Sequence, residues 1–224
     1  MRHRKIDELM SRQVVSVHRD TSFKDIVRAL STNRVTAVPV VDDDNRVLGV
    51  VSEGDLLRKT TDRAAPAELP AVPGLEAWER AKSEGTRAEE LMSAPAVCAR
   101  PGWTFVEAAR LMEVQGVKRL VVADDGDRLV GIVSRRDLLG IFLREDEDIR
   151  REIVQDVLAG ILRLDPELLS VTVRDGRVEL SGSLPFRGMI PALERMCATV
   201  DGVVSVSAHL MYEVDDTAPE NTSS

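Results

Sequence analysis

Two copies of one short motif carry the residues of this sequence that are best suited to chemistry. Glycine, serine and aspartate recur at one spacing, as Gly49, Ser52 and Asp55 and as Gly131, Ser134 and Asp137. Each copy follows an apolar run and precedes a leucine pair, a pattern that predicts a strand leading into a helix. Serine and aspartate at this spacing can form a capping box, which is a structural role. The same helix start can instead attract a phosphate while the carboxylate accepts ribose hydroxyls and the glycine admits the ligand. The spacing alone leaves both interpretations open.

The motif belongs to a longer internal repeat with an offset of 82 residues. Positions 7–57 align with 89–139 without a gap, and 18 of the 51 pairs are identical. Within each copy, a short helix ending at Leu-Met-Ser precedes a brief strand. A helix capped by Ser22 or Thr104 follows, and then two strands joined by an acidic turn. The sequence therefore predicts β-α-β-β-α twice.

The remaining segments differ from the repeats. Residues 61–85 contain several prolines and form a linker, in which only a stretch around Trp78 has a helical pattern. Residues 148–212 predict an α-β-β-α-β unit, with a hairpin at Asp175-Gly176. Residues 213–224 are acidic and poor in apolar groups, which predicts a disordered tail. The predicted fold class is α+β, with two repeats and a small C-terminal domain.

Composition and charge exclude several classes of protein. The 224 residues carry a net charge of −8, which disfavours general nucleic-acid binding. Cys98 and Cys197 form no metal or disulfide framework, and the start of the chain has no apolar run typical of a secretion signal. The three histidines are scattered, and no hydrolase or phosphate-loop motif is present. We therefore expect a cytoplasmic protein that is not an enzyme and binds no metal.

Residues 5–60 and 86–144 resemble a tandem pair of cystathionine-β-synthase (CBS) domains, a Bateman module packed about a pseudo-two-fold axis. In that family, Gly-h-x-[Ser/Thr]-x-x-Asp binds the ribose of adenosine ligands. The resemblance implies that AMP, ADP, ATP or S-adenosylmethionine is a regulatory ligand, with ribose or phosphate contacts from Ser52, Asp55, Ser134 and Asp137. It also implies apolar contacts to the base, from Val15, Ala37, Val38 and Pro39 in the first copy and from Val97, Arg119 and Leu120 in the second.

The two motif copies differ in charge. Arg135 and Arg136 stand where the first copy has Glu53 and Gly54, and Lys118 and Arg119 stand where it has Thr36 and Ala37. Because arginine binds phosphate well and a carboxylate at the helix start repels it, we expect the second motif, through Arg135, to bind phosphate-rich ligands more tightly.

The third unit resembles a BON domain, and its match rests on Gly176, Gly182 and Gly202. That family is associated with phospholipid, yet Asp148 to Tyr212 has a net charge of −2, so a protein partner is an equal alternative. We expect a homodimer formed through Leu56, Leu57, Leu138, Leu139, Ile141 and Phe142. The predicted function is a nucleotide-binding regulator that modulates the BON-like domain or a partner. The alternative is a ligand-free dimerisation scaffold whose BON domain contacts lipid or protein.

Overall fold

The computed structural model describes residues 3–61 and 85–217, which form two compact units. The first unit comprises residues 5–135, and the second comprises residues 3–4 and 136–217. Most of the predicted linker, with the helical stretch around Trp78, and the last seven residues lie outside the described residues. Within the described ranges, no helix is both long enough and apolar enough to span a membrane.

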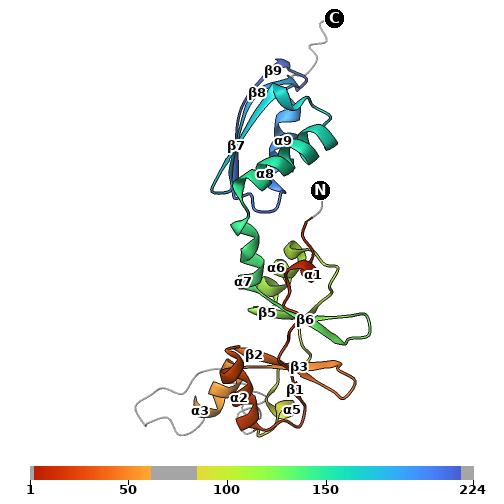
Figure 1. Ribbon diagram of the computed structural model, residues 1–224, viewed down its shortest axis with the longest axis vertical. Coiled ribbons are helices and arrows are strands. Elements are labelled where there is room, and N and C mark those ends of the chain that lie inside the picture. Colours follow the sequence, from red (N-terminus) through yellow and green to blue (C-terminus); the bar gives the residue numbers. More distant parts are fainter. Residues whose placement is uncertain (1–2, 62–84, 218–224) are drawn as a thin grey trace, which may run out of the picture. The chain divides into compact units, whose positions relative to one another are not determined.

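Both repeats form the predicted order of strands and helices (Figure 1). The elements of the first repeat are α1 (Ile6–Leu9), β1 (Val17–His18), α2 (Phe23–Asn33), β2 (Ala37–Val41), β3 (Val47–Ser52) and α3 (Glu53–Thr61). Those of the second are α5 (Ala88–Leu91), β4 (Cys98–Ala99), α6 (Phe105–Val114), β5 (Arg119–Ala123), β6 (Leu129–Ser134) and α7 (Arg135–Leu139). Each three-stranded sheet has a parallel pair followed by an antiparallel hairpin, with one bulge near the hairpin turn.

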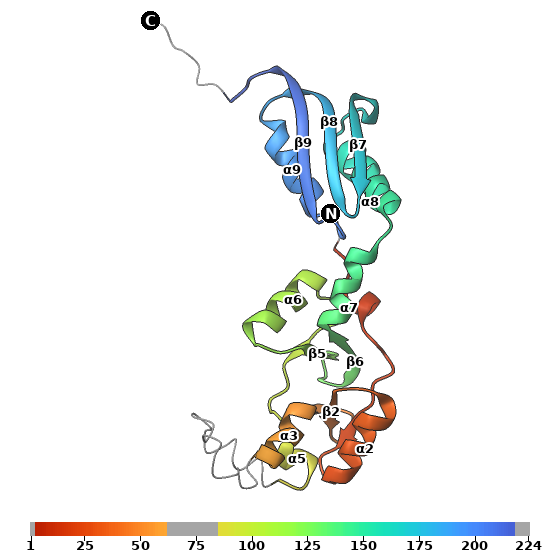
Figure 2. The same cartoon turned by 90° about the vertical axis from the view of Figure 1, so that its left-hand side faces the viewer.

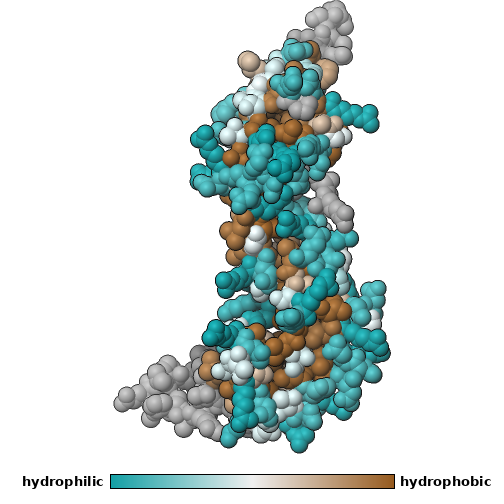
Figure 3. Space-filling view, in the orientation of Figure 1, coloured by the Kyte–Doolittle hydropathy of each residue, from teal (hydrophilic) through white to brown (hydrophobic). Residues whose placement is uncertain are grey.

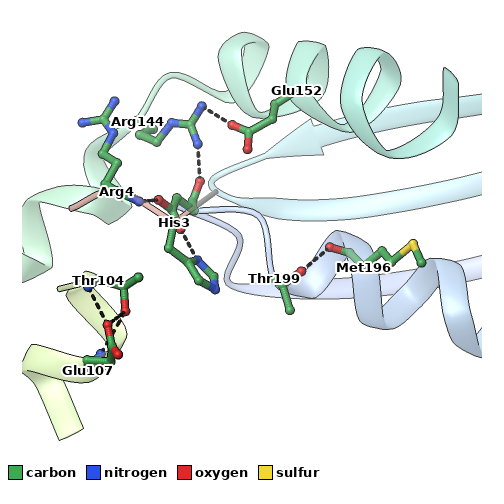
Figure 4. A network of polar contacts seen from close by, with 9 residues as sticks. His3, Arg4, Thr104, Glu107, Arg144, Glu152, Met196 and Thr199 are labelled. Carbon is green, nitrogen blue, oxygen red and sulfur yellow. Dashed lines mark hydrogen bonds and ion pairs between the residues drawn. The ribbon is translucent and has the colours of Figure 1, made fainter. Parts of the chain in front are cut away.

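Side-chain caps start the long helix of each repeat, as the sequence predicts. The backbone N–H of Asp25 donates to Ser22 Oγ at the start of α2, and that of Glu107 donates to Thr104 Oγ1 at the start of α6. Figure 4 shows the reciprocal bonds, in which the N–H and the hydroxyl of Thr104 donate to the Glu107 carboxylate and complete a capping box. These bonds satisfy backbone donors that the first turn of a helix leaves without partners.

The short helices pack on the opposite repeat, which the sequence does not predict. Leu91 of α5 is fully buried in the core of the first repeat, and the backbones of Ser93 and Val50 exchange two hydrogen bonds. Symmetrically, α1 belongs with the second repeat, where Ser11 exchanges two backbone bonds with Ile132. Each repeat therefore completes the core of the other.

The motif glycines allow this exchange of segments. A Cβ atom on Gly49 would lie 2.6 Å from Met92 Sδ and 2.9 Å from the Ser93 carbonyl oxygen. The same atom on Gly131 would overlap the sulfur of Met10. In this structure, the glycines thus admit a methionine from the other repeat, rather than the ligand that the sequence analysis expects there.

The two hairpins meet at their turns, where Asn45 and Asp127 both have positive φ, at 62° and 59°. Val47 N–H donates to the Asp127 carbonyl over 3.0 Å, and Leu129 N–H donates to the Asn45 carbonyl over 2.9 Å. These bonds are equivalent under the 82-residue offset. The repeats therefore pack as the predicted pseudo-two-fold pair.

The second unit has the predicted α-β-β-α-β order. Its elements are η1 (Gly140–Leu143), α8 (Asp146–Glu152), the π-helix η2 (Ile153–Ile161), η3 (Pro166–Leu168), β7 (Leu169–Arg174), β8 (Arg177–Phe186), α9 (Met189–Ala198) and β9 (Ser205–Val214). The sheet order is β7-β8-β9, antiparallel and then parallel. Figures 1 and 2 show α8 and α9 on the same face of this sheet, over the core that contains Leu180 and Cys197.

The beginning of the predicted disordered tail is structured instead. Strand β9 continues to Val214, Arg187 pairs with Asp215 at 2.7 Å, and Gly188 N–H donates to Asp216 over 2.8 Å. The hydrogen bonds from Thr217 and from Arg187 lower the pKa of Asp215 to about 2. These acids supply partners for the loop before α9, which composition alone does not reveal.

The start of the chain joins the second unit through a buried aspartate. Asp201 is 6% exposed, and its carboxylate accepts hydrogen bonds from His3 Nδ1 and from Arg4 N–H, both over 2.7 Å (Figure 4). Arg144 donates to the Asp201 carbonyl over 2.7 Å and pairs with Glu152 at 2.8 Å. The carboxylate of Asp201 is thus hydrogen-bonded where it is buried, as the cost of burying a charge requires.

Candidate functional site

The first motif forms a capping box at the start of α3. Ser52 donates to Asp55 Oδ2 twice, from its backbone N–H over 2.9 Å and from its hydroxyl over 2.6 Å. In return, Asp55 N–H donates to Ser52 Oγ over 3.3 Å. The structural interpretation of the motif therefore describes real contacts, so any ligand contact must come in addition to them.

Asp55 differs from an ordinary capping residue in its burial and in its other oxygen. The residue is 6% exposed, whereas the side chain of Asp25, in the equivalent box of α2, is 53% exposed. Asp55 Oδ1 accepts a hydrogen bond from Ser93 Oγ at 3.3 Å and lies 3.6 Å from an Arg58 guanidinium nitrogen. Ser93 comes from the other repeat, so this carboxylate joins the two repeats at the base of a cavity.

The cavity has a volume of about 420 Å³, within the range of roughly 300–1,000 Å³ common for small-molecule sites. The first motif and the loops before β4 and β5 line it together. The lining residues are Thr36, Ala37, Val50, Ser52, Glu53, Gly54, Asp55, Arg58, Ser93, Pro95, Ala96, Val97, Gly116, Val117, Lys118 and Arg119. The site is therefore composite: the motif comes from the first repeat and much of the wall from the second.

Positive charge enters this cavity from the second repeat. Lys118 and Arg119 line it together with the first motif, and Arg119 donates a hydrogen bond to Thr36 Oγ1. The sequence predicts both cations at the second motif, and in the structure they line the cavity of the first. The pseudo-two-fold packing brings the segment before β5 beside the segment before β2, so the second repeat contributes to the wall at the motif of the first.

The residues expected to contact the base fall into two groups. Ala37, Val97 and Arg119 line the cavity of the first motif. Val38 and Leu120 are fully buried in the interior, Pro39 is also buried, and Val15 packs against the core of the first repeat; none of these four is a lining residue. Strand alternation explains why Val38 differs from Ala37 and Leu120 from Arg119, because neighbouring residues of one strand face opposite sides.

The second motif repeats the backbone geometry of the first. Arg135 N–H donates to the Lys118 carbonyl over 3.1 Å, as Glu53 N–H donates to the Thr36 carbonyl over 3.0 Å. Ser134 and Asp137 are half-buried and Arg135 is exposed. The division between the two units falls within this motif, after Arg135.

Two side chains of the site were missed by the sequence analysis. Arg58 lies one helical turn beyond Asp55, and this i,i+3 spacing could have indicated an ion pair. Ser93 ends the repeated Leu-Met-Ser segment, but nothing in its local sequence indicates that it lies beside Asp55 of the other repeat.

In the described ranges, no three His, Cys, Asp or Glu side chains converge as metal ligands. Burial raises the pKa of the Cys98 thiol, and it raises that of Cys197 to about 12.

Comparison with known families identifies the repeats. Residues 6–62 and 88–144 match the model of the CBS domain, and together they make up just over half of the chain. The chain belongs to the CBS-domain family. Residues 145–213 match the BON domain, so a BON domain follows the CBS pair.

Several characterised and uncharacterised proteins are similar to the CBS pair. The uncharacterized protein MJ1426 of Methanocaldococcus jannaschii is 30% identical over 149 residues, which cover 60% of this chain and 88% of that protein. A CBS domain-containing protein of Dictyostelium discoideum is 30% identical over 139 residues, covering 62% and 91%. The crystal structure of CBSX2 in complex with AMP has a TM-score of 0.53 and 27% identity, and the match covers 62% of this chain and 96% of that one.

Proposed function

We propose that this chain is a regulatory protein whose CBS pair binds an adenosine nucleotide in the cavity of the first motif. The observation that carries the proposal is the meeting of Ser52 and Asp55 with Lys118 and Arg119 around one cavity of about 420 Å³. The likeness to CBSX2, which was crystallised with AMP, supports the choice of ligand.

Each part of the cavity wall suits one part of a nucleotide. Val50, Ala37 and Val97 offer apolar surface for a base, as small-molecule sites commonly do. Asp55 can exchange its long contacts, to Ser93 at 3.3 Å and Arg58 at 3.6 Å, for the two ribose hydroxyls while it keeps its bonds to Ser52. The sugar would then lie at the base of the cavity.

The cations suit the phosphates. Lys118 and Arg119 line the cavity from the second repeat, and charge-assisted hydrogen bonds to phosphate are stronger than neutral ones. Glu53, on the same wall as the motif, opposes phosphate at the start of α3. We therefore propose that the phosphates lie toward the second repeat. At the second motif, Arg135 is proposed to contact phosphate together with Ser134 and Asp137.

A thermal-shift panel tests the proposal. AMP, ADP, ATP and S-adenosylmethionine are added separately to the full chain, since a ligand that binds only the folded state raises the melting temperature. We expect at least one of the four to raise it, and we expect the Asp55→Ala, Asp137→Ala double variant to lose the shift. A folded parent protein that responds to none of the four would contradict the proposal.

We also propose a homodimer formed through the exposed residues of the predicted set. Leu57, Leu139 and Phe142 are 63%, 62% and 45% exposed, and Leu143, next in the chain, is 84% exposed. Leu56, Leu138 and Ile141 are buried and belong to the fold, so their assignment to the dimer surface is wrong. Figure 3 shows hydrophobic surface beside the position that α7 has in Figure 1. Leu139 ends α7, and Phe142 and Leu143 follow it in η1.

Sedimentation of the Leu139→Ser, Phe142→Ser variant tests this dimer. Large exposed apolar groups mark interaction sites, so we expect the variant to lose this interface and to sediment as a smaller species than the parent at the same concentration. A parent that sediments as a 24.7 kDa monomer would contradict the proposal.

Modulation of the BON domain, or of a protein or phospholipid partner, is proposed as the output of nucleotide binding.

Hydrogen exchange and vesicle binding measure that output. We expect the bound nucleotide to change amide exchange within residues 145–213, or to change binding of the chain to phospholipid vesicles. If bound nucleotide changes neither the amide exchange nor the vesicle binding, the proposed regulation is contradicted, whereas the proposal of nucleotide binding still stands.

A further inference from the structure

Strand β9 is an unusually uncharged sheet edge. It has ten residues, from Ser205 to Val214, and it pairs only with β8 among the described strands. Residues 205–212 contain no lysine, arginine, aspartate, glutamate or proline. Proteins usually protect edge strands with such residues or with bulges, because an open edge pairs with other strands. The register with β8 is continuous over 205–212, so no bulge protects β9 there either.

The hydrophobic core is also incompletely covered beside β9. Two of the three core-facing side chains of β7, at the other edge, are well buried: Leu169 is 6% and Val171 is 8% exposed, whereas Val173 is half-buried. On β9, Val206, Ala208 and Leu210 pack against the same core but are only half-buried. Tyr212 and Val214, further along the same face, are 43% and 52% exposed. Among the described residues, no further element covers the core on the β9 side.

The two edges differ in other ways that matter for pairing. Strand β7 has six residues, ends at Arg174, and leads into a turn whose Asp175 and Gly176 N–H groups donate to Asp146. It is therefore short and terminated by charged groups. Strand β9 offers a longer row of backbone donors and acceptors with no charge until Glu213.

We propose that β9 pairs in antiparallel fashion with β9 of a second copy of this chain. The pairing would join two three-stranded sheets into one sheet of six strands and extend both cores across the junction. A second copy fits because a two-fold axis places each strand against itself, so any charged residue near the axis would approach its own like charge. An uncharged strand avoids that repulsion. This surface is separate from the dimer surface that contains Leu139 and Phe142.

His209 and Ser170 provide a matched pair of test positions. Both are exposed, and both lie opposite Ser181 of the central strand, one on each edge of the sheet. A short bismaleimide is applied to His209→Cys and to Ser170→Cys in the full chain. We expect cross-linked dimers from His209→Cys and none from Ser170→Cys beyond the parent, whose Cys197 is buried and whose half-buried Cys98 is present in both variants.

Hydrogen exchange and charge substitution complete the test. We expect amide exchange in 205–214 to slow as protein concentration rises, and we expect His209→Lys to abolish that dependence while Ser170→Lys preserves it. The Leu139→Ser, Phe142→Ser variant should keep the concentration dependence, which separates this interface from the other. Concentration-independent exchange in β9, or equal cross-linking at both positions, would overturn the proposal.

Discussion

The two CBS repeats have the same backbone geometry at their motifs but different charged side chains. The bond from Glu53 N–H to Thr36 has its counterpart in the bond from Arg135 N–H to Lys118, and both motif glycines admit a methionine of the other repeat. Yet the cations Lys118 and Arg119 line the cavity at the first motif, while their sequence equivalents are Thr36 and Ala37. The difference teaches that the repeats are related by symmetry in their packing, whereas the chemistry of the cavity at the first motif depends on residues that both repeats supply.

The largest expected loss of stability comes from substitutions in the short helices α1 and α5, each of which packs on the opposite repeat. Leu91→Ala and Ile6→Ala each remove a fully buried side chain, which should lower the free energy of unfolding by about 2–5 kcal/mol. Because Leu91 packs in the core of the first repeat, Leu91→Ala should speed hydrogen exchange in β2. Faster exchange in β5 alone would place α5 in its own repeat and break the comparison.

Substitution of the motif glycines should destabilise the protein less, and by the same amount in each repeat. Gly49→Ala and Gly131→Ala both force a Cβ atom against a methionine, which should cost about 1–3 kcal/mol in each repeat. Gly102→Ala is the control, because a Cβ atom there has no neighbour within 4 Å. Chemical denaturation measures all three, and a large inequality between the two motif glycines would contradict the shared packing.

Equivalent substitutions in the two repeats should differ in their effect on nucleotide affinity, because only the second repeat supplies Lys118 and Arg119. At the cavity of the first motif, Lys118→Ala should weaken ATP about tenfold, as expected for a lost charged hydrogen bond, and weaken AMP less. Thr36→Ala, at the sequence-equivalent position, removes no charge and should change the difference between ATP and AMP little. Calorimetric titration of both nucleotides checks this, and an unchanged ATP affinity in Lys118→Ala would remove the lysine from the phosphate site.

Removal of the helix caps should give the smallest effects. Ser22→Ala and Thr104→Ala should each cost about 0.5–2 kcal/mol, because both hydroxyls accept the same kind of backbone bond. Neither residue lines the cavity of the first motif, so nucleotide binding there should not change. Thermal unfolding measures the loss of stability. An unchanged stability in either variant would show that the hydroxyl does not stabilise the start of that helix.

Local signals in the sequence predicted most of the fold. The hairpins follow from acidic turns between apolar runs, and the helix starts follow from Ser22 and Thr104. The exchange of α1 and α5 could not be predicted, because Leu-Met-Ser occurs in both copies and fits either core. The π-helix after Glu152 was likewise not predicted, since the apolar spacing there is typical of an ordinary helix.

The candidate site was predicted only in part. The motif indicated Ser52 and Asp55, which the structure places at the cavity. Lys118 and Arg119 were assigned to the other motif, because an alignment of repeats shows which residues are equivalent and not which ones meet. Ser93 reaches Asp55 only through the exchanged segment, so no local pattern could indicate it.

The matched aspartates Asp55 and Asp25 test the central claim most directly. Each accepts a capping bond from a serine three residues earlier, and each has an arginine three residues later, but only Asp55 lines the cavity. Asp55→Ala and Asp25→Ala should both lose a cap, while calorimetric titration should show one nucleotide site fewer in Asp55→Ala and no change in Asp25→Ala. A folded Asp55→Ala protein that keeps every site with the parent's affinity would show that the motif is only a helix cap.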